Sequence, residues 1–141
     1  MTSVLQSTSL LVARVILGVV FMAHGWQKLH TNGMAATKAG FQSMDVPFAT
    51  VSAYVTMLAE IGCGAALILG VLTPVAAVLL ALIMVGAIIW VHLENGLFMS
   101  DGGFEYNIVL IGALLMIAAF GSGKFGLDAL LRVRSGAKQA A

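Results

Sequence analysis

Residues 51–94 decide the fold, and they read VSAYVTMLAEIGCGAALILGVLTPVAAVLLALIMVGAIIWVHLE. The stretch holds two long apolar runs, 51–72 and 75–94, with only Thr73 and Pro74 between them. A bilayer core about 30 Å thick requires roughly 20 apolar residues of helix, so each run can cross a membrane once. Thr can cap a helix and Pro fits its first turn. The dipeptide therefore predicts a tight antiparallel hairpin of two transmembrane helices.

Two more apolar runs flank this hairpin, at 9–29 and, in shorter form, at 105–123. Of the 141 residues, 60% are hydrophobic and 9% are charged, and the mean hydropathy is +1.03. These values are far from those of a soluble domain. We predict one all-α membrane domain over residues 1–141, an integral membrane four-helix bundle that runs up, down, up and down.

The charged and sulfur-bearing residues exclude several classes of function. Seven basic and six acidic residues leave a formal charge of +1, without the clustered basic surface of a nucleic-acid-binding protein. The single cysteine, Cys63, can form neither an internal disulfide nor a thiolate metal site. We expect no metal site, no covalent cofactor and no nucleic acid partner.

Basic residues predict how the chain lies in the membrane. The tail carries more of them than the opposite flank, where only Lys28 and Lys38 lie, so both termini are expected in the cytoplasm. The tail residues are Lys124, Arg132, Arg134 and Lys138.

Two segments outside the spans have the pattern of interfacial structure. In 34–48, apolar residues recur near helical spacing, which predicts a short helix on the outer membrane surface. In 126–134, leucines alternate with Asp128, Arg132 and Arg134, which predicts a basic amphipathic turn or a simple topology anchor.

Ionisable residues inside the spans require a partner or a function, because each costs about 2.5–3.5 kcal/mol to insert. Arg14 and Glu60 lie on the first two spans at depths that differ by roughly 7 Å. We predict a structural ion pair between them. The alternative is that Arg14 reaches the inner interface alone. Glycines on the same stripes, Gly18 and Gly25 on the first helix and Gly64 on the second, permit close helix packing.

Polar residues gather in the outer third of the predicted bundle, which makes this region the candidate site. One interpretation is a site for a small redox head group, with His24 and Glu60 as the proton-exchanging residues. A bis-histidine haem on His24 and His92 and an interfacial belt of polar residues are the alternatives. The candidate binding residues are His24, Gln27, Lys28, Glu60, His92, Glu105 and Tyr106.

Several motifs together resemble the DoxX family of small four-helix membrane proteins. They are Arg14-Val-Ile-Leu-Gly18, His24-Gly25-Trp26-Gln27-Lys28-Leu29, Gly40-Phe41 with Pro47, Glu60-Ile-Gly62-Cys-Gly64, Gly103-Phe-Glu105-Tyr106-Asn107 and Gly121-Ser-Gly-Lys124-Phe-Gly-Leu-Asp128. The resemblance implies a bacterial or archaeal inner-membrane protein associated with redox chemistry. Some relatives are membrane subunits of thiosulfate:quinone oxidoreductase, and others join complexes with superoxide dismutase and a sulfurtransferase or accompany quinone and catechol stress responses. Asp45-Val46-Pro47 departs from the Gly-x-Pro that is common in the family.

Three functions remain open at this stage. The first is the membrane subunit of a quinone-linked oxidoreductase or redox-stress complex, binding a quinone head group near His24 and Glu60. It would not be catalytic alone, because no dinucleotide loop or flavin motif is present to supply electrons. The second is a non-catalytic scaffold that binds a protein partner or another copy of the chain through its small-residue stripes. The third is a small channel or transporter with Arg14 and Glu60 as a relay.

Overall fold

The computed structural model describes residues 3–131, and every regular element within that range is a helix. The all-α fold class is therefore confirmed. Two short 3₁₀ turns, η3 (Leu93–Asn95) and η4 (Met99–Asp101), lie in the connection before the last helix. The longer elements are α1 (Val4–Trp26), the π-helix η1 (Gln27–Thr31), α2 (Gly33–Ser43), α3 (Ala49–Leu69), α4 (Thr73–Ala87), the π-helix η2 (Ile88–His92) and α5 (Glu105–Phe120).

Three helical stretches are long and apolar enough to cross a membrane, namely Val4–Thr31, Ala49–Leu69 and Thr73–Asn95. The shorter apolar helix Glu105–Phe120 accompanies them. The first helix begins at Val4 instead of residue 9. Ser3 and Gln6 form a capping box there, in which Ser3 Oγ accepts from the Gln6 amide at 3.1 Å and Gln6 Oε1 accepts from the Ser3 amide at 2.8 Å. Hydropathy could not place this start, because the first turns are polar.

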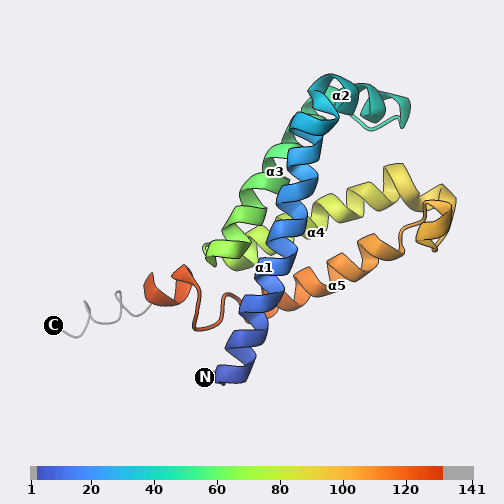
Figure 1. Ribbon diagram of the computed structural model, residues 1–141. Helices are drawn as coiled ribbons and strands as arrows, with labels where there is room; N and C mark the ends of the chain where they lie inside the picture. Colours follow the sequence, from blue (N-terminus) through green and yellow to red (C-terminus); the bar gives the residue numbers. More distant parts are fainter. Residues whose placement is uncertain (1–2, 132–141) are drawn as a thin grey trace.

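The four long helices form two antiparallel pairs (Figure 1). α1 packs mainly on α3, and α4 packs mainly on α5. We call the end that holds the start of α1, the Gly70–Leu72 turn and residues 121–128 the closed end. The amide of Lys124 donates to Ser7 Oγ there at 3.3 Å, so both terminal segments share this end. The other end, with residues 24–48 and 88–104, is called the open end, because the helix pairs diverge toward it.

Glycines fix the register between α1 and α3. A Cβ at Gly18 would lie 2.6 Å from the carbonyl oxygen of Gly64, and a Cβ at Gly25 would lie 3.0 Å from that of Met57. Real Cβ atoms do not approach backbone oxygen so closely, so only glycine allows the two helices to come this near. The predicted close packing through these glycines is confirmed.

This register separates Arg14 from Glu60, and the predicted ion pair between them is wrong. Gly18 faces Gly64, so Arg14, one turn before Gly18, is level with Gly70 at the closed end. Glu60, one turn before Gly64, is displaced toward the open end. The depth estimate from the sequence failed because it placed each helix separately and did not include the offset set by the glycine contacts.

Arg14 instead lies under the C-terminal turn at the closed end. Its side chain is fully buried, and its guanidinium makes no hydrogen bond within the described part of the chain. Asp128 attracts it electrostatically, and a Cβ at Gly126 would lie 2.9 Å from Arg14 Nη1. Asp128 also accepts from the amides of Leu72 at 2.8 Å and Thr73 at 3.0 Å, so it caps α4. The Asp128 carboxylate therefore caps the start of α4 and also attracts the buried Arg14 guanidinium.

The two predicted interfacial segments are partly described. α2 corresponds to the helix expected in 34–48, but it packs against α3 and buries Thr37. In the expected basic turn, residues 127–131 are helical. Arg132, Arg134 and Lys138 lie outside the described residues.

Candidate functional site

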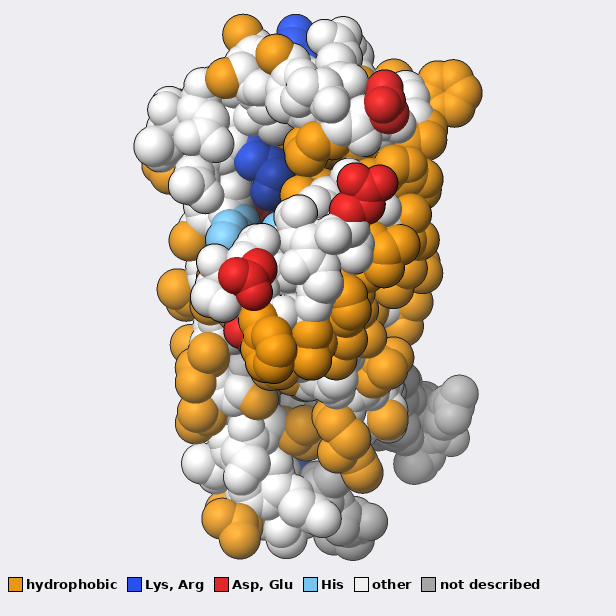
Figure 2. Space-filling model, turned by 90° about the vertical axis from the view of Figure 1, so that its right-hand side faces the viewer, with side chains coloured by type: hydrophobic (Ala, Val, Ile, Leu, Met, Phe, Trp, Pro, Cys, Tyr) orange, Lys and Arg blue, Asp and Glu red, His pale blue; other side chains and the backbone are white. Residues whose placement is uncertain are grey.

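A cavity of about 520 Å³ lies at the open end between the diverging helix pairs. This volume is within the range of small-molecule binding sites. Figure 2 shows basic and histidine side chains at the bottom of a hollow on one face of the molecule. Residues from five helices and from the 96–104 connection line the cavity, so a ligand there would contact nearly every element of the fold.

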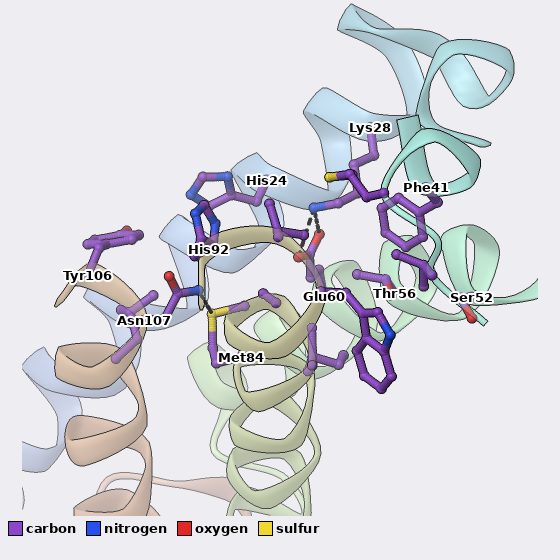
Figure 3. Close-up of a pocket in the computed structure, with 18 of the residues that line it drawn as sticks. His24, Lys28, Phe41, Ser52, Thr56, Glu60, Met84, His92, Tyr106 and Asn107 are labelled. Carbon is purple, nitrogen blue, oxygen red and sulfur yellow. Dashed lines mark hydrogen bonds and ion pairs between the residues drawn. The ribbon is translucent and has the colours of Figure 1, made fainter. Parts of the chain in front are cut away.

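An ion pair between Lys28 and Glu60 forms the polar centre of this cavity (Figure 3). Lys28 Nζ donates to Glu60 Oε1 at 2.8 Å and to Oε2 at 2.6 Å. The Glu60 side chain is only 3% exposed, whereas that of Lys28 is 21% exposed and reaches the cavity from its rim. An ammonium group has three N–H donors, so one remains for a ligand after the carboxylate has taken two.

Short π-helical segments carry four of the cavity residues, namely Lys28 in η1 and Trp90, Val91 and His92 in η2. Lys28 lies in η1, where the amide of Asn32 donates to the Gln27 carbonyl at 2.9 Å across five residues, and His92 ends η2. A π-turn widens the helix and changes the direction of its side chains. Both membrane helices that rise to the open end therefore leave regular α geometry where they reach the cavity.

The histidines lie near the mouth of the cavity. His92 Nδ1 is 2.7 Å from the carbonyl oxygen of Gly102. A carbonyl can only accept, so Nδ1 carries the proton and Nε2 of the neutral ring is an acceptor. The His24 ring lies 6.4 Å from the Tyr106 ring, centroid to centroid, and the side chain is exposed. In the close-up, His24, His92 and Tyr106 lie together on one side of the site, to the left of the ion pair (Figure 3).

Apolar side chains form the deeper walls. Phe21, Met84 and Leu110 are buried beneath the ion pair, and Phe41 and Trp90 close the sides. Such walls exclude water and strengthen every electrostatic interaction at the polar centre. The cavity thus has the amphipathic lining that a flat ring with polar edges requires.

The structure brings together five of the seven candidate binding residues. His24, Lys28, Glu60, His92 and Tyr106 all line the cavity. The remaining two do not line it: Gln27 is exposed, and Glu105 accepts from the Met99 amide at 2.8 Å, which stabilises the 96–104 connection.

Several lining residues were not anticipated from the sequence. α2 contributes Phe41, whose helical spacing had predicted contact with the membrane surface. Thr56 lies one turn before Glu60 on the same face of α3, a spacing that could have identified it. Asn107 is only 6% exposed on α5, and an amide in an apolar helix was the available signal.

Metal coordination has no candidate group within residues 3–131. No cluster of three or more His, Cys, Asp or Glu side chains is arranged there to hold an ion.

Comparison with protein families identifies the chain. Residues 9–93, which include most of α1, all of α3 and most of the cavity residues, match the family model DoxX. The chain belongs to the DoxX family. The resemblance carried by the sequence motifs is therefore confirmed.

Named DoxX-type relatives cover most of the chain. The Bacillus subtilis protein named "Putative oxidoreductase CatD" is 36% identical over 118 residues, which cover 84% of this chain and 83% of CatD. The membrane protein Rv3486 of Mycobacterium tuberculosis is 31% identical, over 90% of this chain and 83% of Rv3486. The inner membrane protein YqjF of Escherichia coli is 28% identical, over 90% and 95%. No solved structure matches the chain.

Proposed function

We propose that this DoxX protein is the membrane subunit of a quinone-linked oxidoreductase or redox-stress complex and that it binds a quinone head group in the open-end cavity. The observation that carries the proposal is the buried Lys28–Glu60 ion pair in an apolar-walled cavity of about 520 Å³. A buried pair with one free N–H donor offers what a ring carbonyl requires, while the walls suit the ring itself. The name of the relative CatD supports an oxidoreductase.

Within this proposal, Lys28 and Glu60 have different tasks. The remaining N–H of Lys28 Nζ donates to a ligand carbonyl and stabilises negative charge that develops on that oxygen. Glu60 accepts or returns a proton at its carboxylate oxygens. Lys28 donates to both oxygens of Glu60, so the carboxylate positions the ammonium group beside the ligand.

His24 and His92 exchange protons between the cavity and its mouth. Nε2 of His92 is the acceptor, since Gly102 holds Nδ1 as the donor. His24 is exposed and lies beside Tyr106, between the ion pair and the outside. A quinone takes up two protons with two electrons when it is reduced to a quinol, and these residues supply the proton route only.

The electrons come from a protein partner in this proposal, because the chain has no dinucleotide-binding loop and no flavin motif. The chain would therefore act as one component of an inner-membrane complex. Its two terminal segments, which share the closed end, would face the cytoplasm as the basic tail residues predict.

Extraction of bound quinone tests the proposal. The tagged protein, purified from its host in mild detergent, is expected to hold close to one quinone per chain by native mass spectrometry. The Glu60→Gln and Lys28→Met variants are expected to lose at least about 90% of it, because one change removes the carboxylate and the other the donor. The matched control is Leu58→Ala, which alters an exposed position of the same helix.

Two outcomes would contradict quinone binding. One is a wild-type protein that carries phospholipid alone. The other is a quinone content in Glu60→Gln that equals that of Leu58→Ala. The small-residue stripes support the scaffold alternative only in part, because Gly18, Gly25 and Gly64 pack inside the bundle, whereas Gly62 is exposed and has nothing within 4 Å of its Cβ position.

A further inference from the structure

A second polar anchor lies in the cavity, on the side opposite the ion pair. Asn107 is on α5, and its side chain lines the same cavity as Lys28 and Glu60. In Figure 3 the two groups lie on different sides of the site, because α5 belongs to one helix pair and α1 with α3 to the other. The cavity therefore has polar groups on both helix pairs, while apolar side chains such as Phe21 and Leu110 form its deeper walls.

The hydrogen bonding of Asn107 leaves most of its capacity for a ligand. The residue is 6% exposed, and its Nδ2 donates to the sulfur of Met84 at 3.5 Å. A thioether is a weak acceptor, and an amide has two N–H donors and one carbonyl acceptor. An amide buried in an apolar helix is costly unless it is well bonded. Met84 is a weak partner for this amide, so Asn107 keeps the capacity to bind a ligand oxygen.

We infer that Asn107 selects, within the proposed quinone site, for rings whose two oxygens lie on opposite edges. One ring oxygen accepts from Lys28 and the other bonds to Asn107 across the cavity. A ring with two adjacent oxygens can engage one of these anchors at a time and leaves the other unpaired. The amide can also turn to donate to a carbonyl or to accept from a hydroxyl, so it serves the oxidised and the reduced ligand alike.

This inference rests on the proposed function, and a pair of isomers tests it separately. The probes are tetramethyl-1,4-benzoquinone and tetramethyl-1,2-benzoquinone, which have equal size and no free ring position for addition of an amine. Trp90 lines the cavity, so quenching of its fluorescence reports binding. The purified full-length chain carries Trp26→Phe, because the exposed Trp26 stacks on His30 outside the cavity and would add a background signal.

The 1,4 isomer is expected to bind about tenfold more tightly than the 1,2 isomer, a difference of ~1.4 kcal/mol. Asn107→Leu keeps the branched shape of the side chain in an apolar helix and removes the amide. In that variant the 1,4 isomer is expected to bind no better than the 1,2 isomer. The control variant Ile108→Leu changes the next, exposed position and should retain the preference.

The outcomes separate the two proposals. Equal affinities of the wild type for both isomers, or a full preference that survives in Asn107→Leu, would overturn the role of Asn107 and leave the quinone site intact. Absence of quenching by both isomers would overturn the quinone site and this inference with it. The wild-type comparison needs no substitution at Asn107, so it decides the matter even if that variant folds poorly.

Discussion

The first membrane helix, α1 continued by η1, carries one cation toward each end of the molecule, and the surroundings of the two cations differ. Arg14 at the closed end is fully buried under the C-terminal turn, with Asp128 as its nearest counter-charge. Lys28 at the open end is 21% exposed, binds Glu60 directly and borders a cavity. Both residues satisfy the same rule for charges in membranes, because each has an acidic neighbour.

The contrast shows that accessibility, more than charge, separates a structural residue from a functional one. Neighbouring glycines at positions 70 and 126 let the backbone close over Arg14, so no ligand can reach it. At the open end the helix pairs diverge, and the space between them leaves one donor of Lys28 available. Substitutions at the two ends should therefore affect different properties.

Gly70→Ala should have the largest effect, on stability. Gly70 has φ +70°, and a Cβ there would collide with Arg14 and with the backbone of Gly126. The left-handed backbone and the overpacking together should lower the free energy of unfolding by about 3 kcal/mol or more. Titration with SDS in mixed micelles measures the change. Gly112→Ala is the control, since nothing lies within 4 Å of its Cβ position, and comparable stability of the two variants would refute the tight closure.

Double-mutant cycles should distinguish Lys28 from Arg14 by their coupling to Glu60. The expected effect on the free energy of unfolding is smaller than that of Gly70→Ala. Lys28→Met and Glu60→Gln are expected to couple by about 1–3 kcal/mol, because each side chain is the direct partner of the other. Arg14→Met and Glu60→Gln should add without coupling, within about 0.5 kcal/mol, because the register places them apart. The same unfolding assay measures both cycles. A coupling of Arg14 with Glu60 that matches the first cycle would show that the α1–α3 register is different.

His92→Leu should have the smallest effect, confined to the open end. The change removes the bond to the Gly102 carbonyl and should raise amide exchange in the 96–104 connection about fivefold, as loss of one hydrogen bond predicts. Overall stability should stay within about 0.5 kcal/mol, since the connection contributes little to the core. Hydrogen exchange with mass spectrometry measures the rates. His30→Leu, an exposed histidine away from this connection, is the control, and an equal rise there would show that the bond is unimportant.

Hydropathy predicted the helices well, because each span must hold enough apolar residues to cross a bilayer. Hydropathy did not identify the start of α1, because Ser3 and Gln6 cap a polar first turn. Helical spacing correctly grouped Phe41 with the apolar face of α2. Helical spacing could not show that this face also lines a cavity, because periodicity shows which residues share a face and does not show what packs against that face.

The polar residues of the site were less predictable than the helices. His24, Lys28 and Glu60 were identified because ionisable groups in a membrane are costly and rare. The pairing of Lys28 with Glu60 was not predicted. It depends on the α1–α3 offset that Gly18 and Gly64 set and on the π-turn that carries Lys28. Asn107 appeared only within a family motif and was not among the candidate binding residues, although the amide Gln27 was.

The Arg14–Asp128 arrangement has a consequence for the order in which the protein is made. α1 leaves the ribosome first, and Asp128 follows more than a hundred residues later along the chain. Through most of synthesis, the guanidinium has no counter-charge from its final neighbourhood, and the start of α4 has no cap. The closed end can assemble only when the last turn arrives. A nascent chain that stops before Asp128 is thus left with a cation in its first helix that lacks this counter-charge.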